Sequence, residues 1–111
     1  MHEYAVASNI VELVLERAQG KRLEKVNLSV GALSGIFTES LTMYLILILE
    51  EKGHLGVNIA AQTASATFQC DCGKQYTAKK MTDACPSCGG YKRLIIWGKD
   101  CVVESIEVSD D

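Results

Sequence analysis

Two closely spaced cysteine pairs constrain the fold of this chain more than any other feature. Cys70 and Cys72 form the first pair, and Cys85 and Cys88 follow after twelve intervening residues. A Cys-x-x-Cys turn followed by glycine lets two sulfurs converge on one ion, and four thiolates complete a tetrahedral Zn²⁺ shell that has no place for a substrate. The cysteines therefore predict a structural zinc site. The segment is too short to bury a core, so metal binding is expected to supply much of its folding free energy.

The sequence also allows other chemical states for these cysteines. Unpaired thiols or a disulfide are the plainest alternatives, but a reducing compartment favours metal binding for such a cluster. A rubredoxin-like iron site is the stronger rival, since the same four sulfurs accept iron. The single spacer between Cys70 and Cys72 narrows the first turn. Cys101 stands apart in a predicted strand and is expected to be a small buried hydrophobe.

Composition narrows the class of protein. The chain has 111 residues, 48% of them hydrophobic, which suits one small globular domain carrying a metal-bound insert. A net charge of -3 argues against nucleic acid as a partner, and the basic residues between Cys70 and Arg93 are expected to form a solvated face. No apolar run is long enough for a membrane span and no export signal opens the chain, so we expect a cytoplasmic protein.

Periodicity predicts the order of helices and strands. Apolar residues at steps of three and four predict a helix over residues 3–18, and a second helix capped by Thr38 is expected to end near Glu50 and Glu51. Four extended runs are predicted around these helices and the cysteines, at residues 26–30, 55–59, 94–97 and 101–108, with residues 67–69 leading extended into the first cysteine pair. We expect an α/β fold in which two helices pack on a small mixed β-sheet, with an inserted zinc-ribbon-like four-cysteine domain. The second helix is apolar on more than one face, which fits the core or a homodimer contact.

The first three residues offer a different kind of metal site. The amine of Met1, the amide nitrogen and imidazole of His2, and the amide of Glu3 can place four nitrogens in a plane, which suits Ni(II) or Cu(II). A frayed terminus with an exposed imidazole is the plain alternative. The other histidine, His54, lies in a glycine-rich turn and is expected at the surface.

Several motifs together resemble the HypA/HybF family of hydrogenase maturation nickel metallochaperones. The resemblance rests on five segments along the whole chain: Met1-His2-Glu3, Gly31-Ala32-Leu33-Ser34, Glu39-Ser40-Leu41, Cys85-Pro86-Ser87-Cys88-Gly89 and Ser105-Ile106-Glu107-Val108. The chain departs from the family in its Cys-x-Cys pair, where Cys-x-x-Cys is usual, and in Phe37-Thr38, where a proline is common.

This resemblance implies Ni²⁺ bound through Met1, His2 and Glu3, with Glu39 as a supporting carboxylate, and Zn²⁺ bound by Cys70, Cys72, Cys85 and Cys88. It implies a nickel-binding domain of residues 1–66 and 99–111, and a zinc-binding domain of residues 67–98 inserted before the last strand. The implied partners are the GTPase HypB and the large subunit of NiFe hydrogenase, to which nickel would be delivered.

The chain is expected not to be an enzyme. It carries no nucleophile paired with a base, no phosphate-binding glycine loop and no paired catalytic carboxylates, so GTP hydrolysis would belong to the partner. Two other functions remain as alternatives, a zinc-ribbon adaptor without a nickel function and a rubredoxin-like electron carrier.

Overall fold

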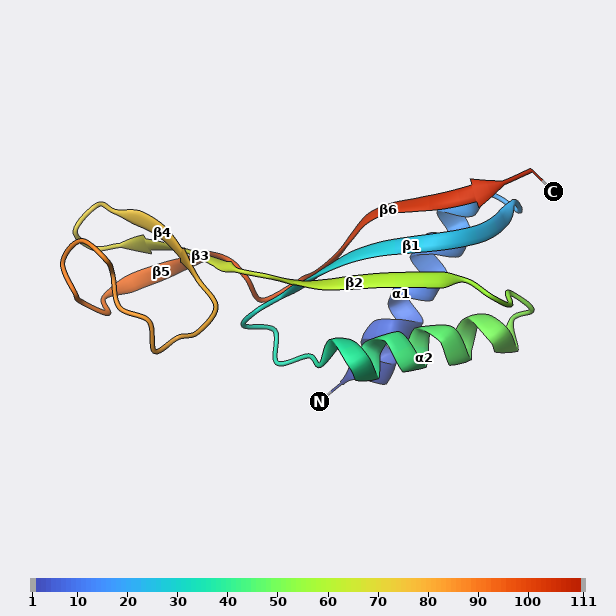
Figure 1. Cartoon of the computed structure of the whole chain (residues 1–111), viewed down its shortest axis with the longest axis horizontal. Coiled ribbons are helices and arrows are strands. Elements are labelled where there is room, and N and C mark those ends of the chain that lie inside the picture. The colour runs from blue at the N-terminus through green and yellow to red at the C-terminus, as the bar shows by residue number, and fades with distance from the viewer. Residues whose placement is uncertain (1, 111) are drawn as a thin grey trace.

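The molecule is elongated and carries two separate three-stranded sheets. The computed structural model describes residues 2–110. Its principal extents are 55 × 26 × 16 Å, with one sheet toward each end of the long axis (Figure 1). α1 (Glu3–Ala18) begins beside α2 (Thr38–Glu51), and β6 (Cys101–Ser109) ends at the end of the molecule away from the smaller sheet.

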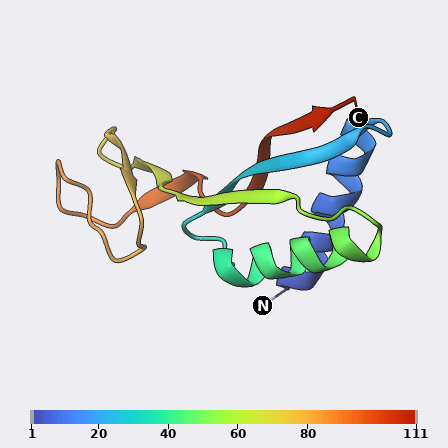
Figure 2. The same ribbon diagram turned by 45° about the vertical axis from the view of Figure 1, so that its right-hand side comes forward.

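The larger unit is an α/β layer built from both ends of the chain. Its elements are α1 (Glu3–Ala18), β1 (Arg22–Gly31), α2 (Thr38–Glu51), β2 (Asn58–Ala64) and β6 (Cys101–Ser109). The strand order is β2-β1-β6, with β1 parallel to β2 and antiparallel to β6. The predicted mixed sheet, completed by the C-terminal strand, is therefore confirmed. Both helices cover the same face of this sheet (Figure 2).

Alternation along β1 places its apolar side chains under the helices. Val26, Leu28 and Val30 are buried, whereas Asn27 and Ser29 point to the open face and hydrogen-bond to β6. Period-two patterning in a strand with one covered face produces this arrangement. The core of the unit comprises Ala7, Ile10, Val11, Val14, Leu23, Val26, Leu28, Val30, Leu41, Leu45, Ile48, Leu49 and Val57.

The smaller unit is an antiparallel sheet beside the cysteines. Its strands are β3 (Ala66–Cys70), β4 (Gln75–Ala78) and β5 (Arg93–Trp97), in the order β4-β3-β5. Contrary to our expectation, this segment does bury a core. That core is small, and two of its five buried members are cysteines: Ala66, Phe68, Cys70, Tyr76 and Cys85. Side-chain burial alone is therefore a weak source of stability for this unit.

Two local predictions were wrong in detail. Thr38 does not cap α2; Phe37 is the N-cap residue, and it makes no side-chain hydrogen bond to the helix. β2 begins at Asn58 instead of Leu55, because the turn through Gly53 and Gly56 leaves Leu55 70% exposed. The extended run predicted at residues 67–69 is confirmed as part of β3, whereas β4 was not predicted.

The chain passes closely by itself where the two units meet. Gly31 at the end of β1 donates its N–H to the carbonyl of Asp100 at 2.9 Å, and Leu33 donates to the carbonyl of Gly98 at 2.8 Å. A Cβ atom on Gly31 would lie 2.2 Å from the Gly98 oxygen. The two units can therefore meet this closely only because residue 31 is a glycine.

We therefore predict that Gly31→Ala destabilises the fold by about 1–3 kcal/mol, the usual cost of forcing extra atoms into a closely packed site. Urea unfolding measures this loss. Ser29→Ala, on the same strand, removes only an exposed hydrogen bond to Glu104 and is the matched control. Equal urea midpoints for the two variants would show that the junction accommodates the extra methyl group with no loss of stability.

Candidate metal centre

Two similar backbone turns bring the cysteine pairs together. In the first, Gly73 donates to the carbonyl of Cys70 and Lys74 accepts from the amide of Cys70. In the second, Gly89 donates to the carbonyl of Cys85, and Gly90 accepts from the amide of Cys85. Both Gly73 and Gly89 have positive φ, at 97° and 72°, which glycine adopts at low cost.

The four sulfurs converge despite the single spacer in the first pair. The ligand atoms of Cys70, Cys72, Cys85 and Cys88 all lie within 4.8 Å of one another. The Cys70 and Cys88 sulfurs are 3.5 Å apart, and those of Cys72 and Cys85 are 3.7 Å apart. Metal–sulfur bonds of about 2.3 Å in a tetrahedron require sulfurs about 3.8 Å apart. The donor set therefore fits one tetrahedral metal ion.

Local electrostatics favour a thiolate at Cys85 but not at Cys88, whose pKa is raised. The amide of Cys88, and then that of Ser87, lower the pKa of Cys85 to about 6, against burial, which raises it. The amide of Cys72 acts in the same sense on Cys70, yet burial and the neighbouring sulfurs leave the pKa of Cys70 raised. A bound cation would favour the charged form of all four groups. The cluster is thus arranged to exchange protons for a metal ion.

Arg93 holds the loop between the two cysteine pairs, a role that the sequence did not reveal. Its guanidinium lies 4.5 Å over the ring of Phe68 and donates to the hydroxyl of Tyr76 at 3.0 Å. It also donates to the backbone carbonyls of Met81 and Asp83. The expectation of a solvated basic face is therefore wrong for Arg93. No local signal distinguishes it from its neighbour Lys92, because its partners come from distant turns.

The N-terminal residues lie at the start of α1, close to the loop before α2. Met1 lies outside the described residues, and the exposed His2 is the N-cap residue, whose carbonyl accepts from Val6 at 3.0 Å. Glu3 is only 6% exposed, and its carboxylate accepts from the amide of Phe37 at 3.3 Å. Its own amide, and then that of Phe37, lower the pKa of Glu3 from 4.5. The burial of this carboxylate was not predicted.

The structure also gives the positions of Glu39 and His54, two polar residues considered from the sequence. Glu39 is exposed in the first turn of α2 and lines a shallow hollow with Thr42 and Ile59. His54 is half-buried in the turn after α2, so it is less exposed than expected. A metal site needs at least three histidine, cysteine or acidic side chains close together. Among residues 2–110, only the four cysteines form such a group.

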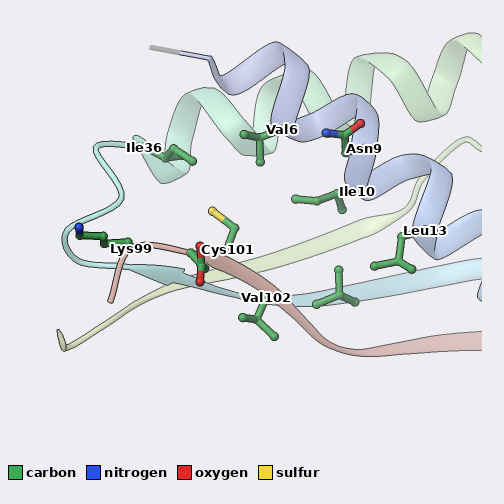
Figure 3. A pocket seen from close by; sticks show the side chains of 10 residues that line it. Val6, Asn9, Ile10, Leu13, Ile36, Lys99, Cys101 and Val102 are labelled. Atoms are coloured by element: carbon green, nitrogen blue, oxygen red, sulfur yellow. The ribbon is translucent and has the colours of Figure 1, made fainter. Parts of the chain in front are cut away.

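A hollow of about 550 Å³ lies between α1 and β6, away from the four cysteines. Val6, Ile10 and Cys101 contribute to its mainly apolar wall (Figure 3). Burial, and then the nearby Asp100, raise the pKa of the Cys101 thiol. Cys101 packs against the larger core as a half-buried apolar residue, close to expectation.

An α/β unit joined to a four-sulfur centre defines a two-part metal-binding protein. Within residues 2–110, no helix combines the length and apolar character needed to cross a membrane. Residues 1–108 match the family described as "Hydrogenase/urease nickel incorporation, metallochaperone, hypA". The chain belongs to the HypA family, which is a family of metallochaperones and not of enzymes.

Individual relatives agree with this assignment over nearly their whole length. The hydrogenase maturation factor HypA of Caldanaerobacter subterraneus subsp. tengcongensis is 34% identical over 113 residues, covering 97% of this chain and 99% of the relative. That of Geotalea daltonii is 32% identical over 111 residues, with the same coverage of both chains. The solution structure of the Ni metallochaperone HypA from Helicobacter pylori has the same fold, with a TM-score of 0.72, 20% identity and complete coverage of both chains.

We predict that Cys85→Ser loses bound metal and disorders residues 70–92, because three thiolates cannot complete a closed shell. The α/β unit, which has its own core, should keep its helical signal. Elemental analysis and amide NMR spectra measure the two effects. Cys101→Ala is the control, since this cysteine lies outside the cluster. Full metal content in Cys85→Ser would contradict the four-thiolate centre.

A second prediction concerns the buried carboxylate of Glu3. A folded-state pKa below 4.5 means that ionised Glu3 stabilises the fold above its unfolded pKa, and that this stability is lost as pH falls through the lower folded value. Glu3→Gln should therefore be less stable than the wild type at neutral pH and approach it in acid. Denaturant unfolding across this pH range tests the effect, with the exposed Glu12→Gln as control. A constant difference at every pH would contradict it.

Proposed function

We propose that this chain is a nickel metallochaperone that binds Ni²⁺ at its N-terminus and delivers it during maturation of the NiFe hydrogenase large subunit. The observation that carries the proposal is the match of residues 1–108 to a family described by nickel incorporation. The relatives named as hydrogenase maturation factors favour hydrogenase as the client.

The proposed nickel ligands are the Met1 amine, the amide and imidazole of His2, and the Glu3 amide. Four nitrogens of this kind suit square-planar Ni(II). Support comes from the position of His2 and Glu3 at the start of a 16-residue helix, which limits the freedom of the chain behind the terminus. His2 is exposed, which leaves its imidazole accessible to an incoming ion.

The buried Glu3 carboxylate supports this site indirectly. Its hydrogen bond to Phe37 attaches the first turn of α1 to the segment that precedes α2. The Glu3 amide and that of Phe37 both lower the pKa of this carboxyl. The bond from Phe37 does not use the Glu3 amide, so nickel bound at that amide would leave it in place. Glu39 stays a proposed supporting ligand.

We assign a structural Zn²⁺ to Cys70, Cys72, Cys85 and Cys88. Zinc at this position would complete a small unit whose own apolar core is limited. We propose the corresponding division into a nickel-binding domain of residues 1–66 and 99–111 and a zinc-binding domain of residues 67–98. The two separate sheets support this division. A colourless protein would distinguish zinc from a rubredoxin-like iron centre, because iron tetrathiolate absorbs visible light.

The proposed partners are the GTPase HypB and the hydrogenase large subunit. HypB would supply the nucleotide hydrolysis that this chain has no residues to perform, and the site of action would be the cytoplasm. The homodimer suggested by the apolar α2 stays a prediction, supported by the exposure of Met43 and Leu47 on that helix.

An extension ahead of Met1 tests the nickel site most sharply. It converts the terminal amine to an amide and removes the basic nitrogen that begins the chelate, so nickel affinity should fall at least tenfold, a change of about 1.4 kcal/mol. His2→Ala should have the same effect through loss of the imidazole. Zinc content and thermal unfolding should stay near those of the untagged chain, because neither depends on the amine.

His54→Ala is the matched control for His2→Ala, since His54 lies in the turn after α2. Nickel titration of the four proteins by calorimetry gives the comparison. Equal nickel affinity in the untagged and extended chains would exclude the terminal site and favour the zinc-ribbon adaptor.

A further inference from the structure

The outer edge of β5 has no strand partner. β5 is the terminal strand of the β4-β3-β5 sheet, and within residues 2–110 only β3 pairs with it. The backbone groups of alternate residues on such an edge point away from the sheet and are available to another extended chain. Figure 1 shows β5 along one border of the smaller sheet.

The side chains of β5 make this edge unusually apolar. Leu94 is 69% exposed and Ile96 is 53% exposed, although both belong to a regular strand. Their neighbours Arg93 and Ile95 point to the opposite face, where Arg93 contacts Phe68. Two large apolar side chains therefore protrude on the face that the loop between the cysteine pairs leaves uncovered.

The strand residues beside Leu94 on this face are uncharged, although Asp71, Lys92 and Arg93 line the hollow next to it. Cross-strand pairing places Gln69 beside Leu94 and Gln75 beside Gln69, and Thr67 pairs with Thr77 further along. Directly opposite residues in an antiparallel sheet share a face. A hollow of about 360 Å³ next to Leu94, between the ends of β3 and β5, adds a recess to this face.

Lysines flank both ends of the free edge. Lys92 directly precedes β5 and Lys99 follows it by two residues, and both are exposed. Only Asp71 and Asp83 of the chain's 14 acidic residues lie between Cys70 and Arg93, against five basic residues. Lysines at a strand edge disfavour pairing between the same strands of two copies of a protein, because their charges repel. Antiparallel pairing of two β5 strands would bring Lys92 of one copy close to Lys99 of the other.

We infer that the β5 edge binds an extended acidic segment of a partner protein by strand addition. Main-chain hydrogen bonds would provide affinity, Leu94 and Ile96 would contact alternate apolar side chains, and Lys92 and Lys99 would attract carboxylates. This surface belongs to the smaller unit, whereas α1 begins in the larger unit (Figure 1). The inference does not depend on nickel, so it can fail or stand separately from the proposed function.

A synthetic peptide of alternating valine and glutamate, about six residues long like an average strand, is the probe. Added to the zinc-loaded chain of 111 residues, it should shift the amide NMR signals of β5 and slow hydrogen exchange there. Leu94→Glu should abolish the effect. Lys92→Glu combined with Lys99→Glu should weaken binding about fivefold to tenfold. The exposed Leu55→Glu and Lys52→Glu, both in the larger unit, are the matched controls.

Two further peptides separate backbone pairing from charge attraction. A version with proline at the centre should lose binding, because proline interrupts the strand hydrogen bonds. A version with lysine in place of glutamate should bind more weakly than the acidic peptide. Equal binding of the acidic and basic peptides, or binding that leaves β5 exchange unchanged, would overturn the inference. Sedimentation showing a dimer that Leu94→Glu dissociates would instead assign the edge to a second copy of the chain.

Discussion

The smaller half of this molecule depends on the convergence of four sulfurs into a space that fits one metal ion. Two of those sulfurs belong to cysteines that also form its small core, so the metal centre and the apolar contacts of Phe68 are parts of one assembly. Within residues 2–110, the larger half buries a core of thirteen apolar residues, mainly from both helices and the sheet. This contrast explains how a short chain can carry two sheets: one has its own buried core, and the metal that we propose at the four cysteines would stabilise the other.

The segment of residues 32–37 connects the two sources of stability. Leu33 packs against the core beside the cysteines, whereas Ile36 packs against the helices. Phe37 then donates to the carboxylate of Glu3. One short loop therefore contacts the smaller unit, the larger unit and the first turn of α1. The path of this loop starts at Gly31, which lies so close to Gly98 that a side chain would not fit between them.

The two proposed metal sites make different demands on the protein. Four cysteines that enclose an ion on all sides suit a permanent structural role. A site made from the first residues and an exposed imidazole leaves one side open to solvent, which suits cargo that must be received and released. Because the two proposed sites lie in separate parts of the chain, nickel could bind and leave the N-terminus without disturbing the four-cysteine site.

The sequence by itself determined the local features of this protein. Helical periodicity located α1 and most of α2, and alternation in β1 identified the buried face, because these patterns depend on neighbouring residues. The spacing of cysteines and glycines likewise predicted which four sulfurs would meet. Only the tertiary structure decided that β1 lies between β2 and β6, that Arg93 holds the loop between the cysteine pairs, and that Glu3 is buried against Phe37. Each of these depends on partners far apart in sequence, whose meeting is set by strand pairing and packing and not by any local pattern.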